Sequence, residues 1–220
     1  MMYRRLAAEF LGTAYLLAII VGSGIMAERL AGGNIAVALL ANSLSTGAGL
    51  AVLILTFGPI SGAHFNPVVS AVEAGFGRLS RTDTLAYLAA QFAGAIVGVV
   101  AANLMFDLPA LSASQRERIG MPQLLGEVVA AFGLVMVILS CAKYRPAAVP
   151  YAVGAYITSA YWFTSSTSFA NPAVTVARSL SDSFAGIRPM DTPAFIAAQV
   201  AGGMLAALLF RWIATDPDRR

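Results

Sequence analysis

Six long apolar stretches, each with at most one charged residue, constrain the fold of this chain more than any other feature. They cover residues 6–26, 35–57, 84–106, 121–142, 147–163 and 193–210. A helix crosses the hydrocarbon core of a bilayer, roughly 30 Å thick, in about 20 residues. Charged residues make up only 11% of the chain, whereas they supply about a quarter of a soluble domain. The sequence therefore predicts an all-α membrane protein with six transmembrane helices.

The charged residues gather in the connections between these stretches and indicate the orientation of the chain. If both termini are cytoplasmic, nine basic residues lie on the cytoplasmic side and five on the other, which the positive-inside rule favours. We therefore expect a multi-pass protein of the cell membrane, in contact with the lipid bilayer, with both termini in the cytoplasm. The basic isoelectric point then reflects orientation, and we expect no nucleic-acid partner.

The residue types that carry most metal and enzyme chemistry are scarce. His64 is the single histidine and Cys141 the single cysteine, so the chain can form neither an internal disulfide nor a cysteine and histidine metal site. The hydrolase motifs GxSxG and HExxH do not occur in the sequence. We expect no metal, no cofactor and no enzymatic activity.

The chain contains an internal repeat. Residues 90–95, AQFAGA, match residues 198–203, AQVAGG, and Glu9 near the start of the first stretch corresponds to Glu127 in the fourth. An Asn-Pro pair also follows the second stretch of each half. Because each half holds three stretches, the second half enters the membrane from the opposite side. We expect one transmembrane channel domain, 1–220, made of inverted repeats at about 4–106 and 121–213.

The two Asn-Pro pairs predict two short helices that enter the membrane without crossing it. Asparagine is a favoured helix N-cap and proline is favoured at the first helical position, so helices should run over residues 66–76 and 171–180. Ten residues rise about 15 Å, half of the hydrocarbon thickness. Their N-termini would meet at the midplane, where partial positive charges repel cations and the amides of Asn66 and Asn171 donate hydrogen bonds to a neutral solute.

Three segments make the chain similar to the aquaporin, or major intrinsic protein, family: AEFLGT at residues 8–13, SGAHFNPV at 61–68 and NPA at 171–173. The resemblance implies six tilted helices and two re-entrant half-helices around an hourglass pore for water and small neutral solutes. It also implies a homotetramer in which each protomer has its own pore.

In most of this family four positions frame an outer constriction of the pore. The resemblance places Thr46 at the first, where water-selective relatives have phenylalanine and glycerol-conducting relatives tryptophan. It places Ser168 just before the second Asn-Pro pair and Val174 where most relatives have arginine. The remaining position is Tyr161 or Ser159, depending on the alignment, and neither is the histidine of strict water channels. We expect a wide outer constriction without an arginine.

Four further ionisable residues have two possible roles each. Arg178, one helical turn beyond the Val174 position, either places a positive charge at the outer mouth, or snorkels or pairs with Asp182 at the interface. His64 either lines the inner vestibule or braces its loop. Glu9 and Glu127 either hold the entering loops, as the resemblance implies, or relay protons.

We therefore predict a passive channel for small uncharged polar solutes: water, glycerol-like polyols, and neutral metalloid acids such as arsenous acid. A water-selective channel is the nearest alternative. A proton-coupled secondary transporter that uses Glu9 and Glu127 is an alternative from another class, because inverted repeats and broken helices also suit transporters.

Overall fold

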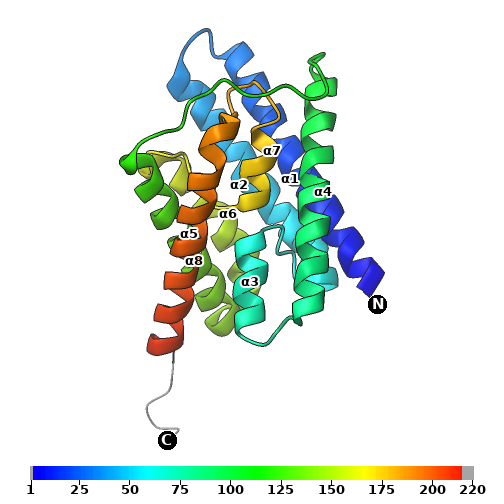
Figure 1. The fold of residues 1–220 in the computed structure, drawn as a ribbon, viewed down its shortest axis with the longest axis vertical. Coiled ribbons are helices and arrows are strands. Elements are labelled where there is room, and N and C mark those ends of the chain that lie inside the picture. Colours follow the sequence, from blue (N-terminus) through cyan, green and yellow to red (C-terminus); the bar gives the residue numbers. More distant parts are fainter. Residues whose placement is uncertain (1, 215–220) are drawn as a thin grey trace, which may run out of the picture.

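A computed structural model of the protein describes residues 2–214, in which every regular element is a helix (Figure 1). Two short 3-10 turns, η1 (Pro146–Ala148) and η2 (Pro189–Asp191), precede α6 and α8. The α-helices are α1 (Met2–Leu30), α2 (Ile35–Ser61), α3 (Pro67–Gly75), α4 (Arg81–Met105), α5 (Met121–Tyr144), α6 (Val149–Phe163), α7 (Pro172–Arg178) and α8 (Thr192–Ile213).

Six of these helices correspond to the six predicted membrane stretches. The helices α1, α2, α4, α5 and α8 are long and apolar enough to cross a bilayer. The sixth, α6, has 15 residues and directly follows η1 in the chain. Most helices extend beyond the uncharged stretches, because polar residues at the membrane surface can continue a helix. The fold class predicted from the sequence is confirmed.

The two predicted half-helices are α3 and α7, and each begins at its Asn-Pro pair. The side-chain oxygen of Asn66 accepts a hydrogen bond from the backbone N–H of Val68, at 2.9 Å. The side-chain oxygen of Asn171 accepts hydrogen bonds from Ala173 and Val174, at 3.0 and 3.3 Å. With nine and seven residues, the two helices rise about 14 and 11 Å, which is too short to span the bilayer.

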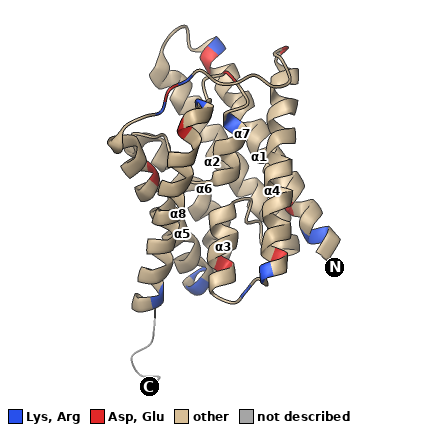
Figure 2. Cartoon of the chain, viewed as in Figure 1, with Lys and Arg blue, Asp and Glu red and all other residues tan. Residues whose placement is uncertain are grey.

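The half-helices lie in opposite halves of the molecule, and their N-terminal ends face each other (Figure 1). We call the end with Met2, Ala214 and the last residue of α3 the terminal face. We call the end with segment 106–120 and the last residue of α7 the loop face. Figure 2 shows that most charged residues lie toward these two faces, as insertion into lipid requires.

Small residues allow the long helices of each half to pack closely in the same way. A side chain at Gly94 of α4 would collide with the backbone of Phe10 in α1. A side chain at Gly202 of α8 would likewise collide with the backbone of Val128 in α5. Small residues at such contacts are typical of membrane helices. These matching contacts agree with the repeat found in the sequence. Both half-helices pack against α4 and α8.

Candidate functional site

A cavity of about 240 Å³ runs along one side of the two half-helices and reaches toward both faces. Arg178 and Phe169 line its end near the loop face. Glu73 and Arg78 line its end near the terminal face, where the Arg78 guanidinium pairs with the Glu73 carboxylate at 2.9 Å. The cavity is the candidate pore.

One side of the cavity is apolar, and its lining residues come from α1, α2, α5 and α6. These residues are Leu16, Ile20, Leu50, Ile54, Leu134, Ile138, Val153 and Ile157. The other side consists of the two loops that lead into α3 and α7, including Gly62, Ala63, Ser168 and Phe169. A solute in the cavity therefore meets an apolar surface on one side and polar backbone on the other.

Both entering loops have a strained backbone. The φ angles of Ala63 and Phe65 are 51° and 48°, and those of Ser168 and Ala170 are 51° and 48°. Such left-handed conformations cost about 1–3 kcal/mol for each residue other than glycine, and persist only where surrounding contacts hold them. The near-identical values in the two loops show that the repeat extends to the backbone geometry.

Asn66 and Asn171 join the two loops at the middle of the cavity. The Nδ2 group of Asn66 donates to the carbonyl of Ala170 at 2.8 Å, and that of Asn171 donates to the carbonyl of Phe65 at 2.7 Å. Because an amide nitrogen carries two hydrogens, each asparagine keeps one donor beyond this bond. Both residues line the cavity, so these donors are available to a solute there.

Glu9 holds the first loop from α1. One carboxylate oxygen accepts hydrogen bonds from the hydroxyl of Ser61 at 2.6 Å and the backbone N–H of His64 at 3.0 Å. The other accepts from the backbone of Phe65 and the side chain of Gln91, both at 2.8 Å. Glu9 is fully buried and is not among the cavity-lining residues.

Glu127 holds the second loop from α5 in the same manner. Its carboxylate accepts from the backbone N–H groups of Phe169 and Ala170, both at 2.9 Å, and from the side chain of Gln199 at 2.6 Å. It too is fully buried and outside the cavity lining. The contacts of both acids match the loop-bracing interpretation, and their separation from the cavity does not suit a proton relay along it.

Near the loop face the cavity is bordered by the side chains predicted for the outer constriction. Thr46 on α2, Tyr161 on α6, Ser168 and Val174 all line it. The hydroxyls of Thr46 and Tyr161 lie 3.3 Å apart, within hydrogen-bonding distance. The buried hydroxyl of Ser168 has no hydrogen-bond partner among the described residues.

The remaining alternative for the α6 position, Ser159, does not line the cavity. Its side chain is exposed on the outside of α6. Two residues along a helix rotate a side chain by roughly 200°, so Ser159 and Tyr161 cannot face the same side. Tyr161 instead continues the cavity-facing row of Val153 and Ile157.

Arg178 lies in the cavity wall near the loop face and does not pair with Asp182. Its side chain is buried, its Nε group donates to the carbonyl of Ala185, and its guanidinium carbon lies 3.4 Å from the ring centre of Phe169. The Asp182 carboxylate accepts instead from the backbone N–H of Gln115, at 3.0 Å.

His64 combines the two roles that the sequence left open. It lines the half of the cavity nearer the terminal face. Its Nδ1 lies 3.0 Å from the hydroxyl of Ser70 in α3, and its ring packs against Tyr87 with ring centres 5.2 Å apart. The histidine is thus both a lining residue and a contact that fixes its own loop.

Sequence reasoning missed Arg118, which lies in segment 106–120 and ties two further segments together at the loop face. Its side chain donates to the carbonyls of Gly186 and Ser166, at 2.8 and 3.1 Å, and to the hydroxyl of Thr167 at 3.3 Å. Burial, with a smaller effect of the charges of Arg178 and Arg116, lowers the pKa of its guanidinium to about 9. Arg118 is therefore charged at neutral pH.

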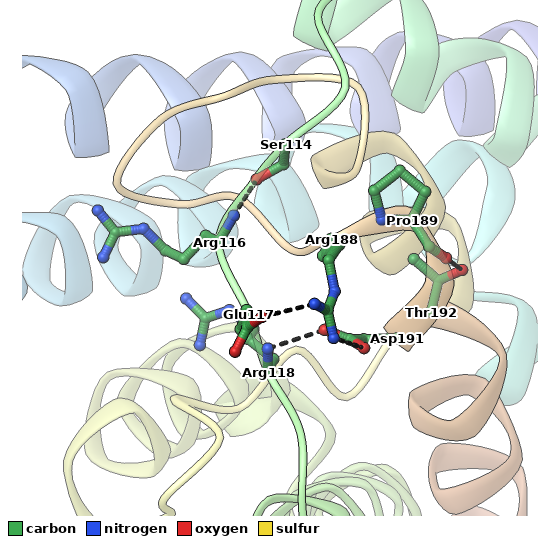
Figure 3. Close-up of polar contacts among 8 residues, drawn as sticks. All are labelled: Ser114, Arg116, Glu117, Arg118, Arg188, Pro189, Asp191 and Thr192. Atoms are coloured by element: carbon green, nitrogen blue, oxygen red, sulfur yellow. Dashed lines mark hydrogen bonds and ion pairs between the residues drawn. The ribbon is translucent and has the colours of Figure 1, made fainter.

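A cluster of ion pairs fixes the backbone beside Arg118 (Figure 3). The backbone N–H of Arg118 donates to Asp191 at 2.9 Å. The Arg188 guanidinium pairs with Asp191 at 3.0 Å and with Glu117 at 2.6 Å. The cluster joins segment 106–120 to the start of α8, so the segment that crosses the loop face is held at the mouth of the cavity.

Replacing Arg118 by glutamine should loosen the mouth of the cavity. The variant loses a charged donor to three acceptors, and hydrogen bonds to charged groups contribute about 1.5–3 kcal/mol each. We expect a clearly lower melting temperature of the purified protein in detergent, measured by intrinsic fluorescence. Arg116→Gln is the matched control, because Arg116 is an exposed arginine of the same segment that pairs with Glu28. Equal melting temperatures of the two variants would contradict the bracing role.

Comparison with known proteins agrees with this geometry. The family model described as "Major intrinsic protein" matches residues 1–150. The chain is 56% identical to "Aquaglyceroporin AqpS" of Rhizobium meliloti, over 96% of this chain and 90% of the relative. It is 27% identical to "Aquaporin Z" of Bradyrhizobium diazoefficiens, over 97% of this chain and 95% of the relative.

A solved structure has the same fold. The X-ray structure of the aquaglyceroporin from Plasmodium falciparum superposes with a TM-score of 0.74, covers 97% of both chains and is 19% identical in sequence. The chain thus has six membrane helices, two half-helices and a pair of asparagines between the half-helices. The family model matches more than half of its length. The protein belongs to the major intrinsic protein family.

Proposed function

We propose that the protein is a passive transmembrane channel for water and small uncharged polar solutes. The observation that carries this proposal is the cavity beside the two half-helices, with the amides of Asn66 and Asn171 at its middle. The N-termini of α3 and α7 add partial positive charge at that place, which disfavours cations. As a member of its family the chain is a channel and not an enzyme.

The residues near the loop face support a channel wide enough for polyols. Thr46 and Val174 stand where bulkier or charged side chains occur in most of the family, and both line the cavity. The apolar wall suits the carbon atoms of a polyol, and the loops opposite suit its hydroxyls. The 56% identical relative is named an aquaglyceroporin. We extend the proposal to neutral metalloid acids such as arsenous acid, which are similarly compact and rich in hydroxyls.

Stopped-flow light scattering on proteoliposomes with the purified protein tests this proposal. Vesicles are exposed to an impermeant osmolyte and, separately, to glycerol. We expect both water and glycerol to cross at least about tenfold faster than in protein-free vesicles, which corresponds to a barrier lower by about 1.4 kcal/mol. Uptake of arsenous acid into the same vesicles tests the extension.

The same experiment separates the alternatives. Fast water without glycerol entry would replace the proposal by a water-selective channel. Glycerol flux that depends on an imposed proton gradient would favour the proton-coupled transporter. The position of Glu9 and Glu127 outside the cavity lining argues against the transporter.

We also propose that a homotetramer of single-domain protomers lies in the cell membrane with both termini in the cytoplasm. Exposed apolar side chains on the long helices, such as Leu40, Val52, Leu125 and Leu208, suit contact with lipid or with a neighbouring protomer. Chemical cross-linking in native membranes would reveal a tetramer. Protease accessibility of tags at the two ends would establish the orientation.

A further inference from the structure

Arg178 lies in the wall of the cavity, although it does not occupy the outer-constriction position at which most relatives have arginine. Val174 occupies that position, and Arg178 follows one helical turn later on α7. Residues four apart lie on the same face of a helix, and both residues line the cavity. The backbone of Arg178 is therefore one helical turn nearer the loop face than that of Val174, and its guanidinium stacks on the ring of Phe169 in the loop that precedes α7.

Packing holds the Arg178 guanidinium in place without using all of its donors. The Nε group donates to the carbonyl of Ala185, and the ring of Phe169 supports the guanidinium. Neither terminal nitrogen of the guanidinium donates a hydrogen bond to an acceptor among the described residues. Neither nitrogen is completely buried. Because these nitrogens retain access to open space in a side chain that lines the cavity, their donors are available to a solute.

No carboxylate in the described part of the chain neutralises this charge by direct contact. Arg178 and Arg118 form no ion pair, and both guanidiniums lie over the ring of Phe169, at 3.4 and 4.8 Å. The nearby acid Glu127 is occupied by backbone and amide donors. The cavity wall near the loop face therefore carries net positive charge in a buried place, where water screens it weakly.

We propose that Arg178, one helical turn after Val174 on α7, forms a solute-binding subsite near the loop face and supplies the cation-excluding charge that Val174 lacks. The subsite binds the oxygen atoms of neutral solutes such as polyols and urea, and rejects cations of the same size. This inference rests on the proposed channel function and adds the residue that sets its selectivity.

A pair of matched solutes tests the charge. Urea and guanidinium have nearly the same planar shape, and only guanidinium is charged. We expect Arg178→Gln to raise the guanidinium-to-urea flux ratio in proteoliposomes at least about tenfold, equivalent to about 1.4 kcal/mol. Arg116→Gln, which removes an exposed arginine outside the cavity lining, should leave the ratio unchanged.

One more variant keeps the test decisive. Arg178→Lys retains the charge and should retain the exclusion of guanidinium, so a folded Arg178→Lys channel that leaks guanidinium freely would overturn the role of the charge.

The outcomes distinguish this inference from the proposed function. If the unmodified protein passes neither water nor neutral solutes, the channel proposal itself fails. If it passes both, and folded Arg178→Gln shows normal water flux with an unchanged guanidinium-to-urea ratio, the channel proposal stands and the subsite is refuted. Size-exclusion chromatography in detergent establishes that each variant is folded before it is reconstituted.

Discussion

Replacement of Glu127 by alanine is expected to abolish transport and to destabilise the protein more than any other single change considered for this chain. Three donors lose their acceptor: the backbone N–H groups of Phe169 and Ala170 and the side chain of Gln199. Each buried donor left without a partner costs about 1–3 kcal/mol. The total of about 3–9 kcal/mol is comparable with the whole stability of many domains.

The position of these donors explains why function should be lost as well. They belong to the loop in which Ser168 and Ala170 have left-handed backbone conformations. Without the carboxylate, the loop loses the two backbone contacts that hold this strained segment against relaxation, and we expect Asn171 to move away from the carbonyl of Phe65. The cavity then loses the asparagine pair at its middle.

Thermal unfolding in detergent and stopped-flow water flux check this prediction. Glu117→Ala is the matched control, because Glu117 is an exposed acid at the loop face that pairs with Arg188. Glu127→Gln keeps the shape but presents an NH₂ group toward N–H donors, so an intermediate loss of stability is expected. A Glu127→Ala protein with the melting temperature and water flux of the control would refute the bracing role.

The sequence contained enough information for the half-helices because their signals are local. An asparagine caps the helix that its neighbouring proline begins, and this geometry depends on only four residues. The structure places the caps at Asn66 and Asn171 as predicted, although α3 ends at Gly75 and α7 at Arg178, earlier than the predicted residues 76 and 180. Helix ends depend on tertiary contacts, and that is why their prediction was less accurate.

The sequence also contained the information needed to choose between Tyr161 and Ser159. Val153, Ile157 and Tyr161 follow one another at intervals of four residues, which defines one face of a helix. The sequence alignment left the position open because the connection to Asn171 differs in length from the family pattern. The helical period of α6 alone would have selected Tyr161.

The role of Arg118 could not have been predicted in the same way. Two of its side-chain acceptors are the carbonyls of Ser166 and Gly186, and every residue has a carbonyl group. Such contacts follow from the path of irregular segments that are 48 and 68 positions away in sequence. No periodicity or motif in segment 106–120 indicates which arginine turns inward.

Substitution of Val174 by arginine should sharply reduce glycerol flux while water still passes. Val174 is buried in the cavity wall, which Thr46, Tyr161 and Arg178 also line. We expect a long side chain at this position to extend into the cavity. We expect glycerol flux to fall at least about tenfold, a barrier increase of about 1.4 kcal/mol, with water flux reduced much less because water is smaller.

The control Val174→Leu separates width from charge. Leucine adds bulk without charge, so a constriction governed by width predicts that leucine lowers glycerol flux part of the way. If Val174→Arg reduces glycerol flux and Val174→Leu has no effect, hydrogen bonding or charge, and not width, limits glycerol. If neither changes glycerol flux in channels with normal water flux, residue 174 does not border the narrowest part. The constriction would then be formed by other lining residues such as Tyr161 and Arg178, and the wide filter proposed here would be wrong.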